Sequence, residues 1–349
     1  VNVRLSIMLA GGGGMRVSDM VSLAVRAEVA GADGVYMPEA WRSGFVTLSA
    51  IAVATSRLSL GPYVLNAHAR TPMIAGMSAV DLDELSGGRL VLGVGSGNRV
   101  TNESYQGVPV IRPLEKMRDY LAVLRGVVEA RYGQRVDYVG ARHSMSGWHP
   151  QVSPVRSRIP ILLAATSPKM AQVAYERADG LALGSLLTRE YVAQARAEGQ
   201  RAAGESFTVT AASFVSVDDD RERARNAARS AVVNLYAGKP HPHYDSLLRQ
   251  QGFADVADAV GEAVEAGDLA AARSAVSDSV VDRLTIAGTR EDCLARLEDY
   301  SDLADELILV NVNTMRYQAG DHAVGAAATG TQDSFSPLLG LIEEASSRR

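Results

Sequence analysis

The sequence contains a single cysteine and no long apolar run. Cys293 is the only cysteine in 349 residues, which excludes disulfide bonds within the chain and metal sites built from clustered thiolates. No apolar run reaches the ~20 residues that a membrane-spanning helix needs, and no basic segment followed by an apolar core marks the first residues as an export signal. These absences predict a protein of the reducing cytoplasm.

A large excess of charge is also absent. With 40 acidic and 35 basic residues the net charge is −5, so neither nucleic acid nor an anionic membrane is an expected partner. The six histidines form no HExxH pair, and His241 and His243 are better explained as a chance surface pair than as a metal site. Small molecules are therefore the expected ligands, and no bound metal is expected.

The residues that are present are typical of one folded domain. Hydrophobic residues make up 47% of the chain and charged residues 21%, proportions far from those of a disordered protein. A length of 349 residues lies in the range in which a single closed α/β barrel forms a whole protein. We expect residues 1–349 to form one domain.

Strand-like apolar runs alternate with amphipathic helical segments, a pattern typical of a parallel sheet covered by helices. The eight predicted strands are residues 3–10, 34–37, 58–66, 89–94, 159–165, 180–184, 207–217 and 306–311. The predicted helices are residues 18–30, 72–85, 113–131, 168–178, 189–203 and 335–346, with a helical excursion over 219–276.

Two segments interrupt this alternation. Residues 134–148 predict an inserted hairpin, and the Gly/Ala/Thr-rich residues 319–332 predict a mobile loop. No GxGxxG opens the first helix, so a closed (β/α)8 barrel is favoured over an open doubly wound sheet.

In a (β/α)8 barrel the active site lies where the strands end, so the residues after each strand are the candidates. Gly11 to Gly14 follow the first strand and either let a flat ring approach the backbone or form a plain flexible turn. Asn66 to Arg70 follow the third strand. Gly95, Ser96, Gly97 and Asn98 follow the fourth, where they favour either a close approach to a cofactor or a tight turn.

The helix after the fifth strand starts with Ser167, Pro168 and Lys169, which are a capping hydroxyl, a first-turn proline and a cation. Exposed N–H groups and the positive end of the helix dipole make such a terminus a natural phosphate site. Every helix needs a cap, however, so an ordinary cap is the alternative. Lys169 favours the phosphate site, because a cation there opposes the dipole unless an anion is present.

Glu39 is the carboxylate placed immediately after the second strand, between Pro38 and Trp41. Apolar surroundings would raise its pKa, and a carboxyl group tuned toward neutrality can hand a proton to an acceptor as hydride arrives, or hold a cofactor ring. The alternative is a carboxylate that caps a helix or forms a salt bridge with Arg42. We take Glu39 as the candidate catalytic residue.

Two motifs indicate a family. The segments from Leu60 to Pro72 and from Leu82 to Gly97 resemble the signature of the luciferase-like superfamily. More narrowly, they resemble the methylenetetrahydromethanopterin reductases and their actinobacterial relatives. The resemblance continues through the segments that begin at Pro160 and Ala178 and covers nearly the whole chain, except the hairpin and the loop near the C-terminus.

The resemblance implies a (β/α)8 barrel, a homodimer and the 5-deazaflavin coenzyme F420, with FMN as the alternative cofactor. It places the ring against a bulge in the third strand that contains a non-prolyl cis peptide, here Tyr63-Val64. It places the ribityl chain and phosphate on two loops. The implied cofactor-binding residues are Tyr63, Val64, Asn66, Gly95, Ser96, Gly97, Asn98, Ala165, Thr166, Ser167, Pro168 and Lys169.

The chain departs from the family pattern at two positions. Met8 stands where the family often has an acidic residue, and Glu39-Ala40 stands where many relatives have Asp-His. We therefore expect hydride transfer to an activated alkene, imine or carbonyl other than the methanopterin substrate. A two-component FMN monooxygenase and a barrel that binds the cofactor without catalysis are the alternatives.

Overall fold

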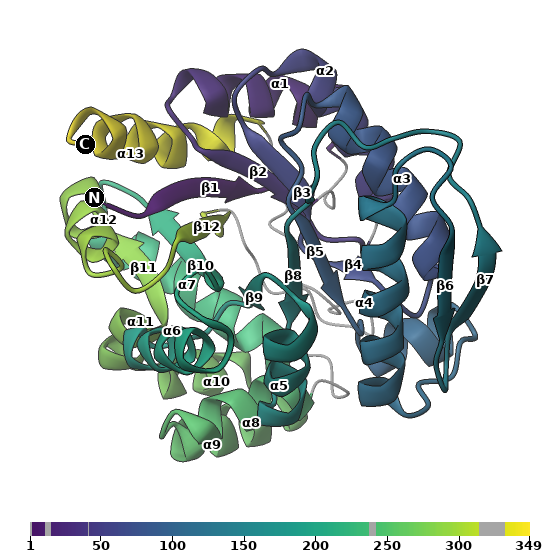
Figure 1. Ribbon diagram of the computed structural model, residues 1–349. Helices are drawn as coiled ribbons and strands as arrows, with labels where there is room; N and C mark the ends of the chain where they lie inside the picture. The colour runs from purple at the N-terminus through teal and green to yellow at the C-terminus, as the bar shows by residue number, and fades with distance from the viewer. Residues whose placement is uncertain (1, 11–14, 41, 237–241, 314–331) are drawn as a thin grey trace. The chain divides into compact units, whose positions relative to one another are not determined.

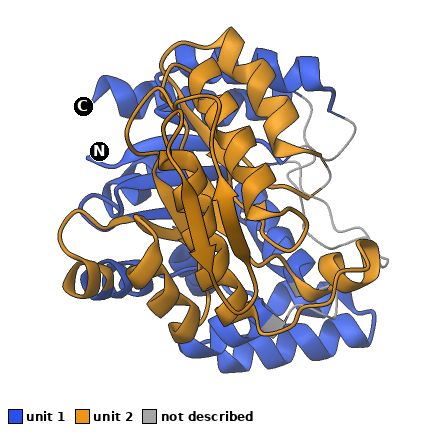
Figure 2. Ribbon diagram, turned by 45° about the vertical axis from the view of Figure 1, so that its right-hand side comes forward, with its two compact units in different colours: residues 1–35, 183–198, 209–349 blue, residues 36–182, 199–208 orange. Residues whose placement is uncertain are grey.

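The computed structural model describes residues 2–10, 15–40, 42–236, 242–313 and 332–349. The chain divides into two compact units (Figure 2), and each is described by itself. Unit 1 comprises residues 1–35, 183–198 and 209–349, and unit 2 comprises residues 36–182 and 199–208. Among the described residues, no helix combines the length and apolar character that crossing a bilayer requires.

Unit 1 contains a parallel sheet in which β12 lies between β1 and β10, and β11 pairs with the far end of β10. These strands are β1 (Arg4–Met8), β10 (Thr208–Val217), β11 (Thr285–Gly288) and β12 (Glu306–Asn311). Its helices are α1 (Val17–Val29), α6 (Arg189–Ala203), α7 (Arg221–Tyr236), α8 (Pro242–Gln250), α9 (Ala254–Glu265), α10 (Leu269–Ala275), α11 (Asp278–Leu284), α12 (Arg290–Glu298) and α13 (Ser336–Ser347), with a 3-10 turn, η2 (Gln332–Phe335).

Unit 2 contains parallel strands in which β5 lies between β4 and β8, and β8 pairs with β9. The strands are β3 (Ser59–Pro62), β4 (Leu65–Asn66), β5 (Leu92–Gly95), β8 (Ile161–Ala164) and β9 (Gly180–Leu183), and β2 (Gly34–Met37) enters the unit at its last residues. The helices are α2 (Gly44–Ala54), α3 (Pro72–Leu85), α4 (Pro113–Glu129) and α5 (Pro168–Arg177), with a π-helical turn, η1 (Val100–Tyr105).

The helices of unit 2 pack closely side by side (Figure 1). Gly76 on α3 meets Val127 on α4, and a Cβ added to Gly76 would lie 2.5 Å from Val127 Cγ1. This glycine is therefore required for the distance between the two helices. The predicted hairpin is confirmed as β6 (Val136–Val139) paired antiparallel with β7 (Ser144–Trp148).

The turn from α3 into β5 holds an arginine whose guanidinium is fully used. Arg89 donates to the main-chain carbonyls of Ser86, Leu58, Ala52 and Thr55 at 2.6 to 2.9 Å, and to the Thr55 hydroxyl at 3.2 Å. One side chain thus ties the C-terminal end of α2 to the start of two strands. These hydrogen bonds give the arginine of the signature a structural role.

An ion pair between Asp83 and Arg156 also holds this turn. The carboxylate of Asp83, which is 1% exposed, accepts from Arg156 at 2.7 and 3.0 Å and from the backbone N–H of Leu90 at 3.2 Å. Gly87 and Gly88 follow with φ of 67° and 84°, a left-handed conformation that favours glycine. The signature residues from Leu82 to Arg89 therefore form the C-terminal end of α3 and the hydrogen bonds that fix the turn after it.

Most predicted elements are confirmed, and the exceptions have physical reasons. Helix α2 was not predicted, because Val46 and Val53 make even its outward face apolar and the sequence lacks a polar stripe. The segment after residue 276 was also missed: α11, β11 and α12 are each short and fall below the length at which periodicity is readable.

Candidate active site

The bulge predicted in the third strand lies between β3 and β4. The Tyr63-Val64 peptide is cis, which confirms the prediction, and the Tyr63 N–H donates to the Met37 carbonyl at 2.7 Å. The Val64 side chain lies against β5, where a Cβ added to Gly95 would be 2.6 Å from Val64 Cγ2. Gly95 therefore has a packing reason for lacking a side chain, and its role at a cofactor stays a prediction.

The loops after β4 and β5 are joined by a chain of amide hydrogen bonds. Asn66 Nδ2 donates to Asn102 Oδ1 at 2.8 Å, and Asn102 Nδ2 donates to the Ser96 carbonyl at 2.8 Å. Gly97 has φ of 62°, and a Cβ on it would lie within 2.9 Å of the Asn66 side chain. Asn98 accepts from the Thr101 N–H at 2.7 Å and so begins η1.

The predicted residues of these two loops are therefore adjacent. Asn102 was missed by the sequence analysis, although it is fully buried and joins the two loops. No local pattern identifies it, because its position in a π-helical turn depends on the loop that precedes it.

Glu39 forms an ion pair with Arg70. Its Oε1 accepts from Arg70 Nε at 2.9 Å and from a terminal nitrogen at 2.6 Å, while Oε2 lies 3.4 Å from the backbone N–H of Asn66. The hydrogen bond with Glu39 raises the pKa of Arg70. The salt-bridge alternative had named Arg42 as the partner. In the structure Glu39 pairs instead with Arg70, which lies in the loop after β4.

The start of α5 has the predicted cap. Ser167 accepts from the Met170 N–H at 3.3 Å, and Pro168 occupies the first turn. Ala165 is buried, whereas Thr166 to Lys169 are exposed. Lys169 forms no ion pair with any residue that the structure describes. The terminus thus offers an exposed helix start and a cation to an anion, and phosphate binding there stays a prediction.

A buried polar cluster lies behind the loop that follows β4. Lys116 Nζ is 3.2 Å from the ring nitrogen Nδ1 of His68, a residue that is 6% exposed. The backbone N–H of His68 donates to Asn66 Oδ1 at 3.0 Å. The Tyr120 ring contacts the His143 ring edge-on with centroids 5.7 Å apart. Sequence analysis had noted only the loop that carries His68. Lys116 and Tyr120 come from a helix face, and His143 comes from the hairpin.

Several predicted features lie outside the described residues. These are Gly11 to Gly14, Trp41, His241 and residues 319–331. Met8 is described and is 7% exposed at the end of β1 in unit 1. Within the described ranges, no three His, Cys, Asp or Glu side chains gather as metal ligands would.

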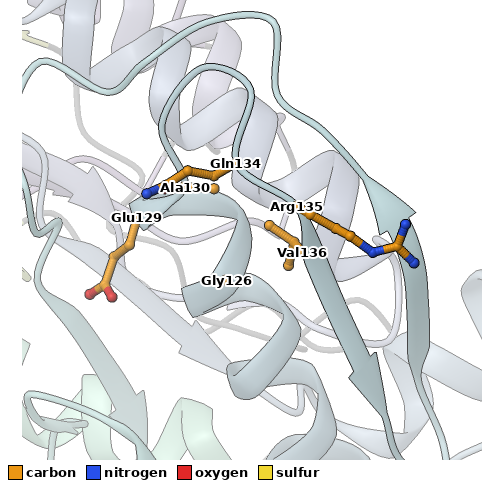
Figure 3. A pocket seen from close by; sticks show the side chains of 6 residues that line it. All are labelled: Gly126, Glu129, Ala130, Gln134, Arg135 and Val136. Carbon is orange, nitrogen blue, oxygen red and sulfur yellow. The ribbon is translucent and has the colours of Figure 1, made fainter.

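A shallow open pocket of about 450 Å³ lies between the end of α4 and the first strand of the hairpin (Figure 3). Its lining residues are Gly126, Glu129, Ala130, Gln134, Arg135 and Val136. Glu129 is already paired with Arg125 and Arg158, and no predicted site residue lines the pocket. It is therefore not the candidate site.

Comparison with known proteins agrees with the fold. The model of the luciferase-like monooxygenase family matches residues 3–306. The chain belongs to this family, and the prediction of an enzyme of the oxidoreductase class is thereby confirmed.

Two relatives and one solved structure narrow the resemblance. A 5,10-methylenetetrahydromethanopterin reductase from Archaeoglobus fulgidus is 32% identical, covering 79% of this chain and 83% of the relative. A putative coenzyme F420-dependent oxidoreductase from Mycobacterium tuberculosis is 30% identical, covering 82% of this chain and 88% of the relative.

The structure of the coenzyme F420-dependent tetrahydromethanopterin reductase from Methanopyrus kandleri matches 99% of this chain and 98% of its own with a TM-score of 0.77. At 22% identity this likeness shows the fold alone, and it confirms the predicted (β/α)8 barrel.

Proposed function

We propose that this chain, as one (β/α)8-barrel domain of the cytoplasm, is an F420-dependent oxidoreductase. It transfers a hydride between the reduced coenzyme and a small organic acceptor with a C=C, C=N or C=O bond. The observation that carries the proposal is the agreement of two relatives from different organisms. One is a reductase by name and the other a putative F420-dependent oxidoreductase, and each match covers about four fifths of both chains.

The residues of unit 2 fit an elongated cofactor with a phosphate. Backbone without side chains at Gly95 and Gly97 lies beside the Val64 bulge, and the two glycines cannot be replaced without displacing Val64 or Asn66. The free N-terminus of α5 with Lys169 suits the phosphate. When bound, the coenzyme supplies the hydride.

The protein's own contribution is position and proton control. The Asn66, Asn102 and Ser96 chain fixes the two loops in one arrangement. Glu39 lies at the carboxyl end of β2, and Arg70 holds its Oε1, so the carboxyl group has a fixed direction. We propose that Glu39 holds the ring or passes the proton that accompanies the hydride.

Reconstitution tests the cofactor. The protein is titrated with F420 and, separately, with FMN, and reduced F420 is then mixed with a panel of electrophilic acceptors while its absorption is followed. We expect tight F420 binding and oxidation of the reduced form, without oxygen, by one class of acceptor. Binding of F420 with no oxidation by any acceptor supports the non-catalytic alternative.

The second candidate is a two-component FMN monooxygenase, which the description of the family model favours. This enzyme would take reduced FMN from a partner and consume oxygen. Oxygen uptake with reduced FMN, combined with no affinity for F420, would replace the main proposal.

We also propose a homodimer, which exposed apolar side chains on α2 and α3 support. Val46 and Val53 on α2 are 67% and 71% exposed, and Ile74 and Met77 on the adjacent α3 are 49% and 44% exposed. Exposed apolar side chains on two adjacent helices are a common mark of a protein–protein interface. Light scattering after size exclusion should show a dimer for the native chain and a monomer for Val53→Glu.

The matched control is Val139→Glu, at a 91% exposed valine on the hairpin, which should stay dimeric. A native chain that elutes only as a monomer refutes the dimer.

A further inference from the structure

The cluster behind the β4 loop contains buried polar atoms without partners. Within the described part of the chain, His68 Nε2, His143 Nε2 and the Tyr120 hydroxyl are buried and form no hydrogen bond. An unpartnered buried donor costs about 1–3 kcal/mol, so three in one place call for an explanation. The His68 and Tyr120 side chains are at least nine tenths buried.

The contact with Lys116 fixes the role of His68. An ammonium group can only donate, so Nδ1 of His68 accepts from Lys116 Nζ at 3.2 Å. The ring proton then sits on Nε2, the atom without a partner. His68 therefore presents an N–H donor beside a half-buried cation.

The carboxylates that face the cluster are already committed. Asp119 accepts from the Tyr138 hydroxyl at 2.8 Å and from the backbone N–H groups of His143 and Arg142. Glu39 is held by Arg70. No described carboxylate forms an ion pair with Lys116, and Arg142 adds a further positive charge nearby.

Protonation agrees with this geometry. Burial, and then the Lys116 charge, lower the pKa of His68 to about 4, and burial lowers the pKa of His143. Both rings are thus neutral at pH 7, each with one N–H. A neutral ring beside a cation can bind an anion without first taking up a proton.

We propose that Lys116, His68 and His143 form a binding site for a carboxylate or phosphate group of a ligand of this enzyme. Lys116 supplies the charge and His68 Nε2 donates a hydrogen bond. A metal ion is disfavoured, because no third His, Cys, Asp or Glu ligand from the described residues joins the two imidazoles. A water cluster would satisfy the donors but leave the ammonium without a counter-ion.

The site adjoins the proposed cofactor loops, since the backbone N–H of His68 donates a hydrogen bond to Asn66 Oδ1. The proposal therefore rests in part on the proposed function. The anion has two possible sources: the acidic tail of the coenzyme or an acidic group of the acceptor. Both sources present an anionic oxygen to the site, and the second measurement below distinguishes them.

The first measurement uses the protein without coenzyme. Inorganic phosphate and malonate are titrated separately while the histidine ring nitrogens are followed by NMR. We expect saturable binding, a shift of His68 Nε2 and a rise in the pKa of His68. The same titration of Lys116→Met and His68→Gln should show at least tenfold weaker binding, because each loses a charge-assisted contact.

His149→Gln is the matched control, because this histidine is exposed on the hairpin strand end and should leave binding unchanged. Equal anion affinity in all three variants, no shift at His68 in the native protein, or a stronger response to Zn²⁺ than to either anion overturns the proposal. These results do not depend on F420, so they stand apart from failure of the proposed function.

The second measurement identifies the source. If the coenzyme tail is the anion, Lys116→Met weakens F420 binding at least tenfold and leaves affinity for a tail-free deazaflavin unchanged. If the acceptor is the anion, F420 affinity is unchanged, while KM rises for an acidic acceptor and not for its neutral ester. Equal affinities and equal KM values in both comparisons overturn a role in ligand binding.

Discussion

Two polar regions of unit 2 differ in how completely their groups are paired. At the α3 to β5 turn, Arg89 and Asp83 are satisfied by backbone groups and by Arg156. In the cluster of Lys116, His68 and His143, buried donors have no partner among the described residues. Both regions are polar and both are largely buried, so polarity and burial alone do not distinguish them.

This difference distinguishes a polar network that stabilises the fold from one that can bind a ligand. A network that satisfies itself stabilises the fold and has nothing left to offer a ligand. A network with unpaired donors lowers the stability of the free protein. A ligand that accepts hydrogen bonds from these donors restores that stability. The family signature contributes to both regions, since Leu82 to Arg89 lies in the first and Leu60 to Pro72 contains His68 of the second. Glu39, one of the departures from the family pattern, pairs with Arg70, two residues after His68.

The largest expected effect comes from breaking the satisfied region. Asp83→Ala leaves Arg156 and the Leu90 N–H without their acceptor, so the free energy of unfolding should fall by about 3 kcal/mol. Urea unfolding followed by circular dichroism measures the loss. Activity per folded molecule should stay the same, and a fall in that activity at full stability would contradict the assignment.

A change in the functional region should have the opposite signature. Glu39→Gln keeps the shape and one bond to Arg70 but removes the titratable proton, so turnover should fall by ~10²-fold with F420 affinity nearly intact. Stopped-flow oxidation of reduced F420 by the acceptor found in the panel measures it. Glu84→Gln, at an exposed acid on α3, is the control. Native turnover with lower thermal stability would make Glu39 structural.

A smaller effect is expected at the start of α5. Lys169→Ala should weaken F420 binding by about 1–2 kcal/mol, as for a lost charge-assisted hydrogen bond, and leave stability unchanged. Fluorescence titration of the coenzyme gives the affinity. An equal loss for phosphate-free deazaflavin would show that Lys169 acts elsewhere than on the phosphate.

The smallest effect is a pH dependence that belongs to the unpaired cluster. The pKa of His68 is about 4 in the folded chain, below its ordinary value of 6.5, so the unfolded chain takes up the proton first as pH falls. Stability is therefore complete above pH 6.5 and is lost on the way down to pH 4. We expect about 1 kcal/mol between pH 6 and pH 5.

Comparison with His68→Gln isolates this contribution, because the variant should unfold with less dependence on pH in that window. His149→Gln should keep the native dependence. Identical curves for all three proteins would mean that His68 is not protonated differently on unfolding.

The fold was largely predictable, because periodicity and turn residues carry it. The predicted helix over 72–85 matches α3, and the last strand over 306–311 matches β12. Helix α2 escaped prediction because its exposed face is as apolar as its buried one. That face is the one on which the proposed dimer rests, so a failure of prediction coincides with a candidate interface.

The candidate site was predictable only where it follows strand ends. Position after a strand located Glu39, Asn66 and the loop from Gly95 to Asn98. The partner of Glu39 was assigned to its neighbour Arg42, whereas the structure pairs it with Arg70. Lys116 and His143 were missed because they lie on a helix and in the hairpin, distant in sequence from His68. No local sequence pattern predicts that these elements come together.

Arg89 recognises main chain almost exclusively, since four carbonyl oxygens and one hydroxyl accept its donors. Every residue type carries the same carbonyl, so positions 52, 58 and 86 can change identity without losing this contact. The Arg89 hydrogen bonds thus require a particular backbone path at these positions but almost no particular side chains. The buried side chains of Ala52 and Leu58 are constrained by core packing and not by the Arg89 hydrogen bonds.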